Sequence, residues 1–198
     1  MKLYFVPGAC SLAVNIALRE ADISFELARV DLATQQTEGG IDFRGINAKG
    51  YVPALKLDDG NVLTENVAIL QYVADAKPQS QLAPAAGTFA RYRLMEWLSF
   101  INSEVHKGFS PLFADNPGEA LRAYAVDRLV KRFDYLQGAL QPPFLLGGHF
   151  TVADAYLYTV LGWAPEVGVS LGRWPGLVHY HEDIGRRPHV VAAHESER

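Results

Sequence analysis

The chain contains 198 residues, of which 49% are hydrophobic and 20% are charged, and its net charge is -4. This apolar fraction is typical of folded globular chains and excludes an intrinsically disordered protein. The mild acidity argues against a nucleic-acid-binding protein, whose phosphate contacts need a concentrated cationic face. No apolar run approaches the ~20 residues that span a bilayer, and Pro7-Gly8 ends the N-terminal run too early for a secretory signal.

Cys10 is the only cysteine, so a disulfide within the chain is impossible. A single unpaired thiol fits a reducing compartment better than an oxidising one. We therefore expect a cytoplasmic protein.

The first eighty residues alternate between strand and helix patterns. Short apolar runs predict strands, and apolar residues spaced three or four apart predict helices. In chain order we expect a strand at residues 2–6, a helix at 10–21, a strand at 25–31, a loop with room for one helical turn at 32–47, a β-hairpin at 52–64 and a helix at 67–76. The Asp59-Gly60 pair between two apolar runs is the hairpin signal. One mixed sheet with helices packed on it satisfies this order.

After a linker-like stretch at residues 77–87, the patterns are helical throughout. We expect helices at 88–113, at 119–140, from Thr151 towards Gly162, and after Trp174 and Arg187, where proline occupies the first turn. The fold class is therefore α/β followed by all-α. The expected domains are residues 1–80 and 87–198.

Cys10 is the sharpest candidate for chemistry. It follows a strand and a Pro-Gly turn, at the expected start of a helix, where unpaired N–H groups and the helix dipole stabilise a thiolate. The alternative is a small buried hydrophobic residue, which is the commoner fate of a free cysteine. A dithiol motif would need a second cysteine at position 13, which is Ala13. An external thiol must therefore resolve any mixed disulfide, and glutathione is the abundant cytosolic one.

Glu65 and Asn66 lie between the hairpin and the next helix. They are either ordinary helix-capping residues or the residues that hold the ammonium and carboxylate of a free amino-acid end, as in the γ-glutamyl group of glutathione. Val52 precedes Pro53, which is either an edge-strand proline or a cis proline that exposes the Val52 backbone to an extended peptide.

A polar stripe follows the long helix expected at residues 88–113. At about 100° per residue, Ser99, Ser103, His106 and Ser110 share one side of it. This stripe is either one edge of a binding site or an exposed helix face with an ordinary histidine. The histidines near the C-terminus lack the spacing of a zinc site, so no metal is expected.

With these residues in place, the chain resembles the bacterial beta-class glutathione transferases. The resemblance covers nearly the whole chain. Its most specific stretches are KLYFVPGACSL (2–12), NAKGYVPAL (47–55), LTE (63–65), EVHKGFSPLF (104–113) and TVADAYL (151–157).

The resemblance implies a thioredoxin-like N-terminal domain, an all-helical C-terminal domain, a homodimer and a role in detoxification. It implies that Cys10 and His106 are catalytic, that Cys10 forms a mixed disulfide with glutathione, and that Thr151 and Asp154 cap a helix. The implied glutathione-binding residues are Cys10, Gln35, Val52, Glu65, Asn66, Ser99, Ser103 and His106.

Gln35 and Ser99 depart from the family pattern. Gln35 stands where relatives often carry a lysine that meets a glutathione carboxylate, and losing that contact weakens binding by roughly 1–2 kcal/mol. Ser99 replaces a common asparagine, and Asn66 replaces a smaller residue.

We therefore expect an enzyme that transfers the glutathione thiol to small, mostly apolar electrophiles, with glutathione as co-substrate and no cofactor. One alternative is a glutathione-dependent thiol transferase or peroxidase-like reductase. Another is a non-catalytic binding protein on the same fold.

Overall fold

Five strands form one mixed sheet in the N-terminal part of the chain. They are β1 (Lys2–Phe5), β2 (Glu26–Asp31), β3 (Gln36–Thr37), β4 (Ala54–Lys56) and β5 (Val62–Thr64), in the spatial order β3-β2-β1-β4-β5. β1 is parallel to β2 and antiparallel to β4, and β4 and β5 form the predicted hairpin. The computed structural model describes all residues, 1–198.

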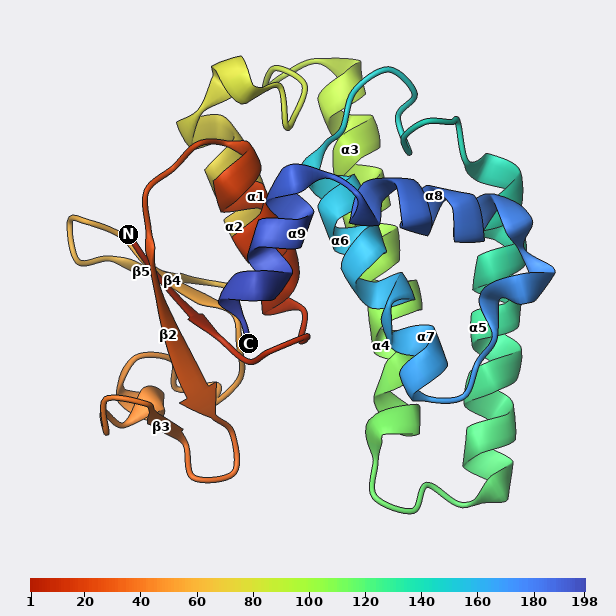
Figure 1. Ribbon diagram of the computed structural model, residues 1–198, viewed down its shortest axis with the longest axis horizontal. Helices are drawn as coiled ribbons and strands as arrows, with labels where there is room; N and C mark the ends of the chain where they lie inside the picture. The colour runs from red at the N-terminus through yellow and green to blue at the C-terminus, as the bar shows by residue number, and fades with distance from the viewer. The chain divides into compact units, whose positions relative to one another are not determined.

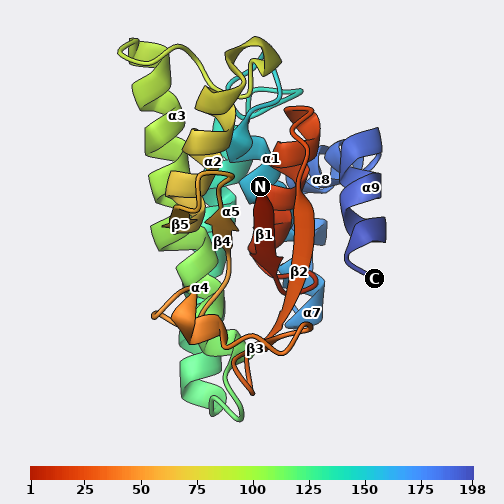
Figure 2. The same ribbon diagram turned by 90° about the vertical axis from the view of Figure 1, so that its left-hand side faces the viewer.

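Two helices cover one face of this sheet, α1 (Ser11–Glu20) and α2 (Asn66–Ala76). Figure 2 looks onto the strands, with α1 and α2 behind them. Side chains alternate between the two faces of a strand, so Leu3 and its partner Leu55 share a face; both are fully buried. The predicted thioredoxin-like arrangement of a mixed sheet with helices is thus confirmed.

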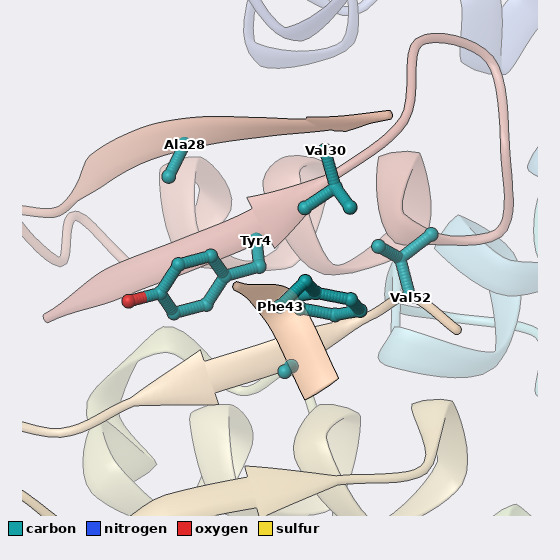
Figure 3. Close-up of a cluster of buried hydrophobic side chains, with 6 residues drawn as sticks. Tyr4, Ala28, Val30, Phe43 and Val52 are labelled. Atoms are coloured by element: carbon teal, nitrogen blue, oxygen red, sulfur yellow. The ribbon is translucent and has the colours of Figure 1, made fainter. Parts of the chain in front are cut away.

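The opposite face of the sheet is covered by a short turn. Tyr4 pairs with Ala28 on one side and Ala54 on the other, and these residues pack with Val30, Val52 and the fully buried Phe43 (Figure 3). Phe43 begins a 3-10 turn at Phe43–Gly45, which is the single turn expected within residues 32–47. The two-residue strand β3 in the same segment has no sequence signal of its own.

The last helix, α9 (Pro188–Ser196), packs against α1 of the N-terminal unit. Val190 and Ala193 are fully buried, and the guanidinium of Arg187 donates to both carboxylate oxygens of Glu20, at 2.7 and 2.8 Å. Packing therefore defines one unit of residues 1–83 with 187–198, and a second of 84–186. This differs from the expected 87–198 domain because α9 buries its apolar side on α1.

The second unit, residues 84–186, contains no named strand. Its principal helices are α3 (Phe89–Phe100), α4 (Lys107–Phe109), α5 (Glu119–Ala139), α6 (Val152–Leu161), α7 (Trp163–Glu166) and α8 (Pro175–Gly185) (Figure 1). Every residue of α6 is buried, so this helix forms the centre of the unit. At its start, the Asp154 carboxylate accepts hydrogen bonds from the Thr151 backbone N–H and hydroxyl, at 2.8 and 2.9 Å, as the implied cap requires.

The helix expected at residues 88–113 is not uniform. Between α3 and α4 the chain forms a π-helical segment, Ile101–His106, in which the Lys107 N–H bonds to the Asn102 carbonyl five residues earlier. Apolar spacings of three and four do not reveal this extra residue per turn. A 3-10 turn, Ser110–Phe113, follows α4. No helix in the structure is both long and apolar enough to cross a membrane.

Candidate functional site

Cys10 lies at the N-cap of α1, immediately before Ser11, as the sequence predicts. Its side chain is partly buried, and its Sγ donates a hydrogen bond to the carbonyl oxygen of Val52 over 3.4 Å. This hydrogen bond stabilises the protonated thiol, whereas the helix start stabilises the thiolate. The thiol is therefore held at the junction of α1 and the segment that leads into β4.

Two side chains brace the turn that precedes Cys10. The Ser11 hydroxyl bonds to both the N–H and the carbonyl of Val6, at 3.3 and 3.2 Å. The Gly8 N–H donates to the Glu197 carboxylate at 3.0 Å, and Gly8 has a φ of 69°, which favours glycine. The backbone around Cys10 is thus fixed from two sides.

The buried side chain of Val52 fixes the position of this residue. Its backbone lies at the end of the loop that leads into β4. The Val52 side chain packs in the cluster beneath the sheet (Figure 3), and the peptide bond from Val52 to Pro53 is cis, which is the second of the two alternatives for this proline. The preceding loop is organised by Asn47, whose amide donates to the Tyr51 carbonyl at 2.7 Å and accepts from the Lys49 N–H at 3.2 Å.

Glu65 is the N-cap of α2 and has a φ of 73°, a conformation that is strained for a residue with a side chain. Its carboxylate accepts hydrogen bonds from the Lys49 ammonium and, at 2.7 Å, from the Tyr51 hydroxyl. These bonds raise the pKa of both Lys49 and Tyr51 above their ordinary values. The Glu65 carboxylate therefore accepts hydrogen bonds from one cationic donor and one neutral donor.

Asn66, the first residue of α2, has an amide that is buried without a hydrogen bond. Only 6% of the residue is exposed, and neither Oδ1 nor Nδ2 has a partner. A buried amide that lacks hydrogen bonds is destabilising, and native proteins contain few of them. Asn66 lies beside Glu65, at the start of α2.

Gln35 braces the loop instead of presenting a donor. Its Nε2 donates to the carbonyls of Leu32 and Gly50, at 2.8 and 3.1 Å, while its Oε1 is buried without a partner. Because both carbonyls need donors, the reverse orientation of the amide is unfavourable. An acceptor oxygen does not attract a carboxylate, so this arrangement does not favour Gln35 as the partner of one.

In the second unit, Ser99 and Ser103 are both exposed, and the Ser103 hydroxyl donates to the Ser99 carbonyl at 2.9 Å. His106, at the end of the π-helical segment, is half-buried and lies edge-on to the ring of Trp163, with ring centroids 4.9 Å apart. Burial, together with the charge of Lys107, lowers the pKa of His106 to about 4, so the ring is neutral at pH 7.

A hydrogen-bond chain fixes the orientation of the His106 ring. Its Nδ1 lies 2.6 Å from the hydroxyl of the fully buried Tyr156, and that hydroxyl donates to Asn102 Oδ1 at 3.0 Å. Because the tyrosine hydroxyl has one proton, its oxygen accepts from Nδ1–H. His106 therefore carries its lone pair on Nε2.

Comparison with known proteins decides the family. Residues 8–76 match the model of the glutathione S-transferase N-terminal domain, and residues 100–188 match that of the C-terminal domain. The chain is 43% identical to glutathione S-transferase GstA of Escherichia coli O157:H7, over all of this chain and 98% of the other. The chain belongs to the glutathione S-transferase family.

Solved structures of other transferases agree with this assignment. A sphingomonad glutathione S-transferase complexed with glutathione matches with a TM-score of 0.96 and 48% identity, over 100% of this chain and 98% of the other. A bacterial beta-class enzyme from Sphingomonas chungbukensis matches with a TM-score of 0.96 and 46% identity, over the same shares. The predicted resemblance to beta-class glutathione transferases and the predicted fold class are confirmed, and the protein is a glutathione transferase.

Within the N-terminal unit of this transferase, two pairs of predicted residues come together: Cys10 with Val52, and Glu65 with Asn66. Sequence reasoning missed Lys49 and Tyr51 as partners of Glu65, although both lie in the stretch that carries the family resemblance. It also missed Tyr156 and Asn102 as partners of His106. Tyr156 follows the predicted cap at the start of α6, but only the packing of α6 against the π-helical segment brings its hydroxyl to His106.

Proposed function

We propose that this glutathione transferase binds glutathione with the residues that the family resemblance implies: Cys10, Val52, Glu65, Asn66, Ser99, Ser103 and His106. Gln35 acts indirectly in this proposal, because its amide holds the loop that leads to Val52. The substrate of the conjugation is a small, mostly apolar electrophile, and no cofactor takes part.

The contact between Cys10 Sγ and the Val52 carbonyl carries the proposal. It places the only thiol of the chain beside the backbone of Val52, which the family resemblance implies is a glutathione-binding residue. The strained Glu65 and the unsatisfied Asn66 amide add polar groups for the zwitterionic γ-glutamyl end.

Cys10 also supports thiol exchange. Its thiolate attacks one sulfur of oxidised glutathione, a Cys10–glutathione disulfide forms, the original disulfide breaks, and one glutathione leaves as the thiolate. Since the chain has no second cysteine, a further glutathione must release the adduct. A thiol transferase or peroxidase-like activity is therefore the second candidate function.

Mass spectrometry after incubation with oxidised glutathione tests the site. We expect one glutathione adduct, located on Cys10, and none in Cys10→Ala; an inert Cys10 would contradict the proposed mechanism. Assays of Cys10→Ala then separate the two activities. If disulfide exchange is lost and conjugation is kept, Cys10 is a redox residue; if both are lost, Cys10 is required for each.

Calorimetry with reduced glutathione separates an enzyme from a non-catalytic binding protein or an empty scaffold. If glutathione binds with measurable heat but no electrophile is turned over, the protein is a non-catalytic binding protein. If millimolar glutathione gives no heat, the chain keeps the fold of the family but does not bind the ligand. We also propose a homodimer in the cytoplasm, on the basis of the family and of the single cysteine. Light scattering would test the dimer, and fractionation of the source cells would test the location.

A further inference from the structure

The Lys49–Glu65 ion pair is exposed and lies at the start of α2. About half of each side chain is accessible, 45% for Lys49 and 52% for Glu65. Exposed ion pairs of this kind contribute little to stability because water competes for both charges. The Lys49 ammonium is therefore easily displaced from Glu65 by another cation.

Groups that favour an anion lie next to this pair. The first N–H groups of α2, an eleven-residue helix, carry the partial positive charge of the helix start. The Asn66 amide, 94% buried and without a partner, lies at the same place and is able to donate through Nδ2. Within a few residues the chain thus offers one site for a cation, at Glu65, and one for an anion, at the start of α2.

A ligand end that carries an ammonium and a carboxylate on one carbon matches this arrangement. The γ-glutamyl group of glutathione is such an end. A second cation would complete the alternation of charges, and Gln35 does not supply it because its amide is neutral and already donates to two carbonyls. Lys49 is already in place, held by Glu65 and by the Thr64 hydroxyl at 2.9 Å.

We propose that Lys49 is a specificity-determining residue that exchanges partners when glutathione binds. The ligand ammonium takes the place of the Lys49 ammonium on Glu65, and Lys49 turns to the α-carboxylate of the same γ-glutamyl group. The four charges then alternate in sign, and no charge loses its counter-ion. This inference rests on the proposed function, since it assumes that glutathione binds at Glu65 and Asn66.

Calorimetry with three reduced ligands tests the exchange: glutathione, 4-aminobutyryl-Cys-Gly, which lacks the α-carboxylate, and glutaryl-Cys-Gly, which lacks the ammonium. We expect Lys49→Met to weaken the binding of glutathione and of glutaryl-Cys-Gly about tenfold, the size of one charge-assisted contact. It should not weaken the binding of 4-aminobutyryl-Cys-Gly, which has no α-carboxylate for Lys49 to contact. We expect Glu65→Gln to weaken the binding of glutathione and of 4-aminobutyryl-Cys-Gly, which both carry the ammonium, but not the binding of glutaryl-Cys-Gly, which lacks it. Lys56→Met, a change to an exposed lysine on β4, is the matched control and should alter none of the three.

Two results would overturn the inference while leaving the proposed function intact. If Lys49→Met weakens the binding of all three ligands equally, Lys49 acts only through its positive charge and makes no specific contact with the α-carboxylate. If the Lys49→Met variant binds glutathione more tightly than the unaltered protein, Lys49 only competes with the ligand ammonium for Glu65. In contrast, failure of the unaltered protein to bind glutathione would reject the proposed function itself.

Discussion

The carboxylate of Glu197 accepts a hydrogen bond from the backbone N–H of Gly8, two residues before Cys10, over 3.0 Å. The same carboxylate accepts from the Asn15 amide at 3.1 Å, and Glu197 is only 6% exposed. The turn that positions the thiol is therefore held by a side chain that follows α9, 189 residues along the chain from Gly8.

Replacing Glu197 by alanine should destabilise the fold by about 1 kcal/mol, because the Gly8 N–H loses its acceptor and the buried Asn15 amide loses one of its three. Urea unfolding followed by circular dichroism measures this difference. Glu195→Ala, at an exposed position of α9, should change the free energy of unfolding by less than about 0.5 kcal/mol. Equal effects of the two substitutions would contradict the bracing role.

The contribution of Glu197 should also depend on pH. Burial raises the pKa of this carboxyl above its ordinary 4.5, although the hydrogen bonds from Asn15 and Gly8 oppose the shift. Since the folded chain holds the proton more tightly, the stability that Glu197 adds is fully present below pH 4.5 and is lost as the pH rises through the folded-state pKa. The difference in unfolding free energy between the unaltered protein and Glu197→Ala should be larger at pH 4 than at pH 8; a constant difference would rule this out.

His106 should have the opposite dependence on pH. Its pKa of about 4 lies below the ordinary 6.5, so the unfolded chain binds the proton more tightly. Its contribution to stability is present above pH 6.5 and is lost as the pH falls towards 4, by up to about 3 kcal/mol. His106→Asn, which keeps a donor towards Tyr156 but does not titrate, should remove this dependence in unfolding measured from pH 4.5 to 7.5. His179→Gln, at an exposed position, should keep it.

Asn66→Ala should move stability and binding in opposite directions. Removing a buried amide without partners should raise the free energy of unfolding by about 1 kcal/mol. The same change should weaken glutathione binding in calorimetry by about tenfold, because the ligand loses a donor. A loss of stability together with unchanged affinity would mean that the amide serves the fold alone.

Glu65 provides a matched pair of substitutions, Glu65→Gly and Glu65→Ala. Both remove the carboxylate and should weaken glutathione binding equally. Only glycine relieves the backbone at φ 73°, so Glu65→Gly should be more stable than Glu65→Ala by about 1 kcal/mol in thermal or urea unfolding. Equal stability of the two variants would show that the backbone at this position is not strained.

The sequence alone predicted the elements whose signals are local. Apolar periodicity identified α1, α2 and α5, the Asp59-Gly60 pair identified the hairpin, and Thr151 with Asp154 identified the start of α6. It also placed Cys10 at a helix start and Glu65 with Asn66 at another, because turn and cap residues reveal where helices begin.

Contacts between distant segments were decided only by the tertiary structure. Nothing local to Lys49 or Tyr51 predicts that both reach Glu65, and nothing near Ile101–His106 distinguishes a π-helical segment from an α-helix. The packing of α9 on α1, which brings Glu197 to Gly8, likewise depends on which apolar faces meet. Periodicity and capping act within a few residues of the chain, whereas the partners of a site's side chains are set by the packing of elements far apart in sequence.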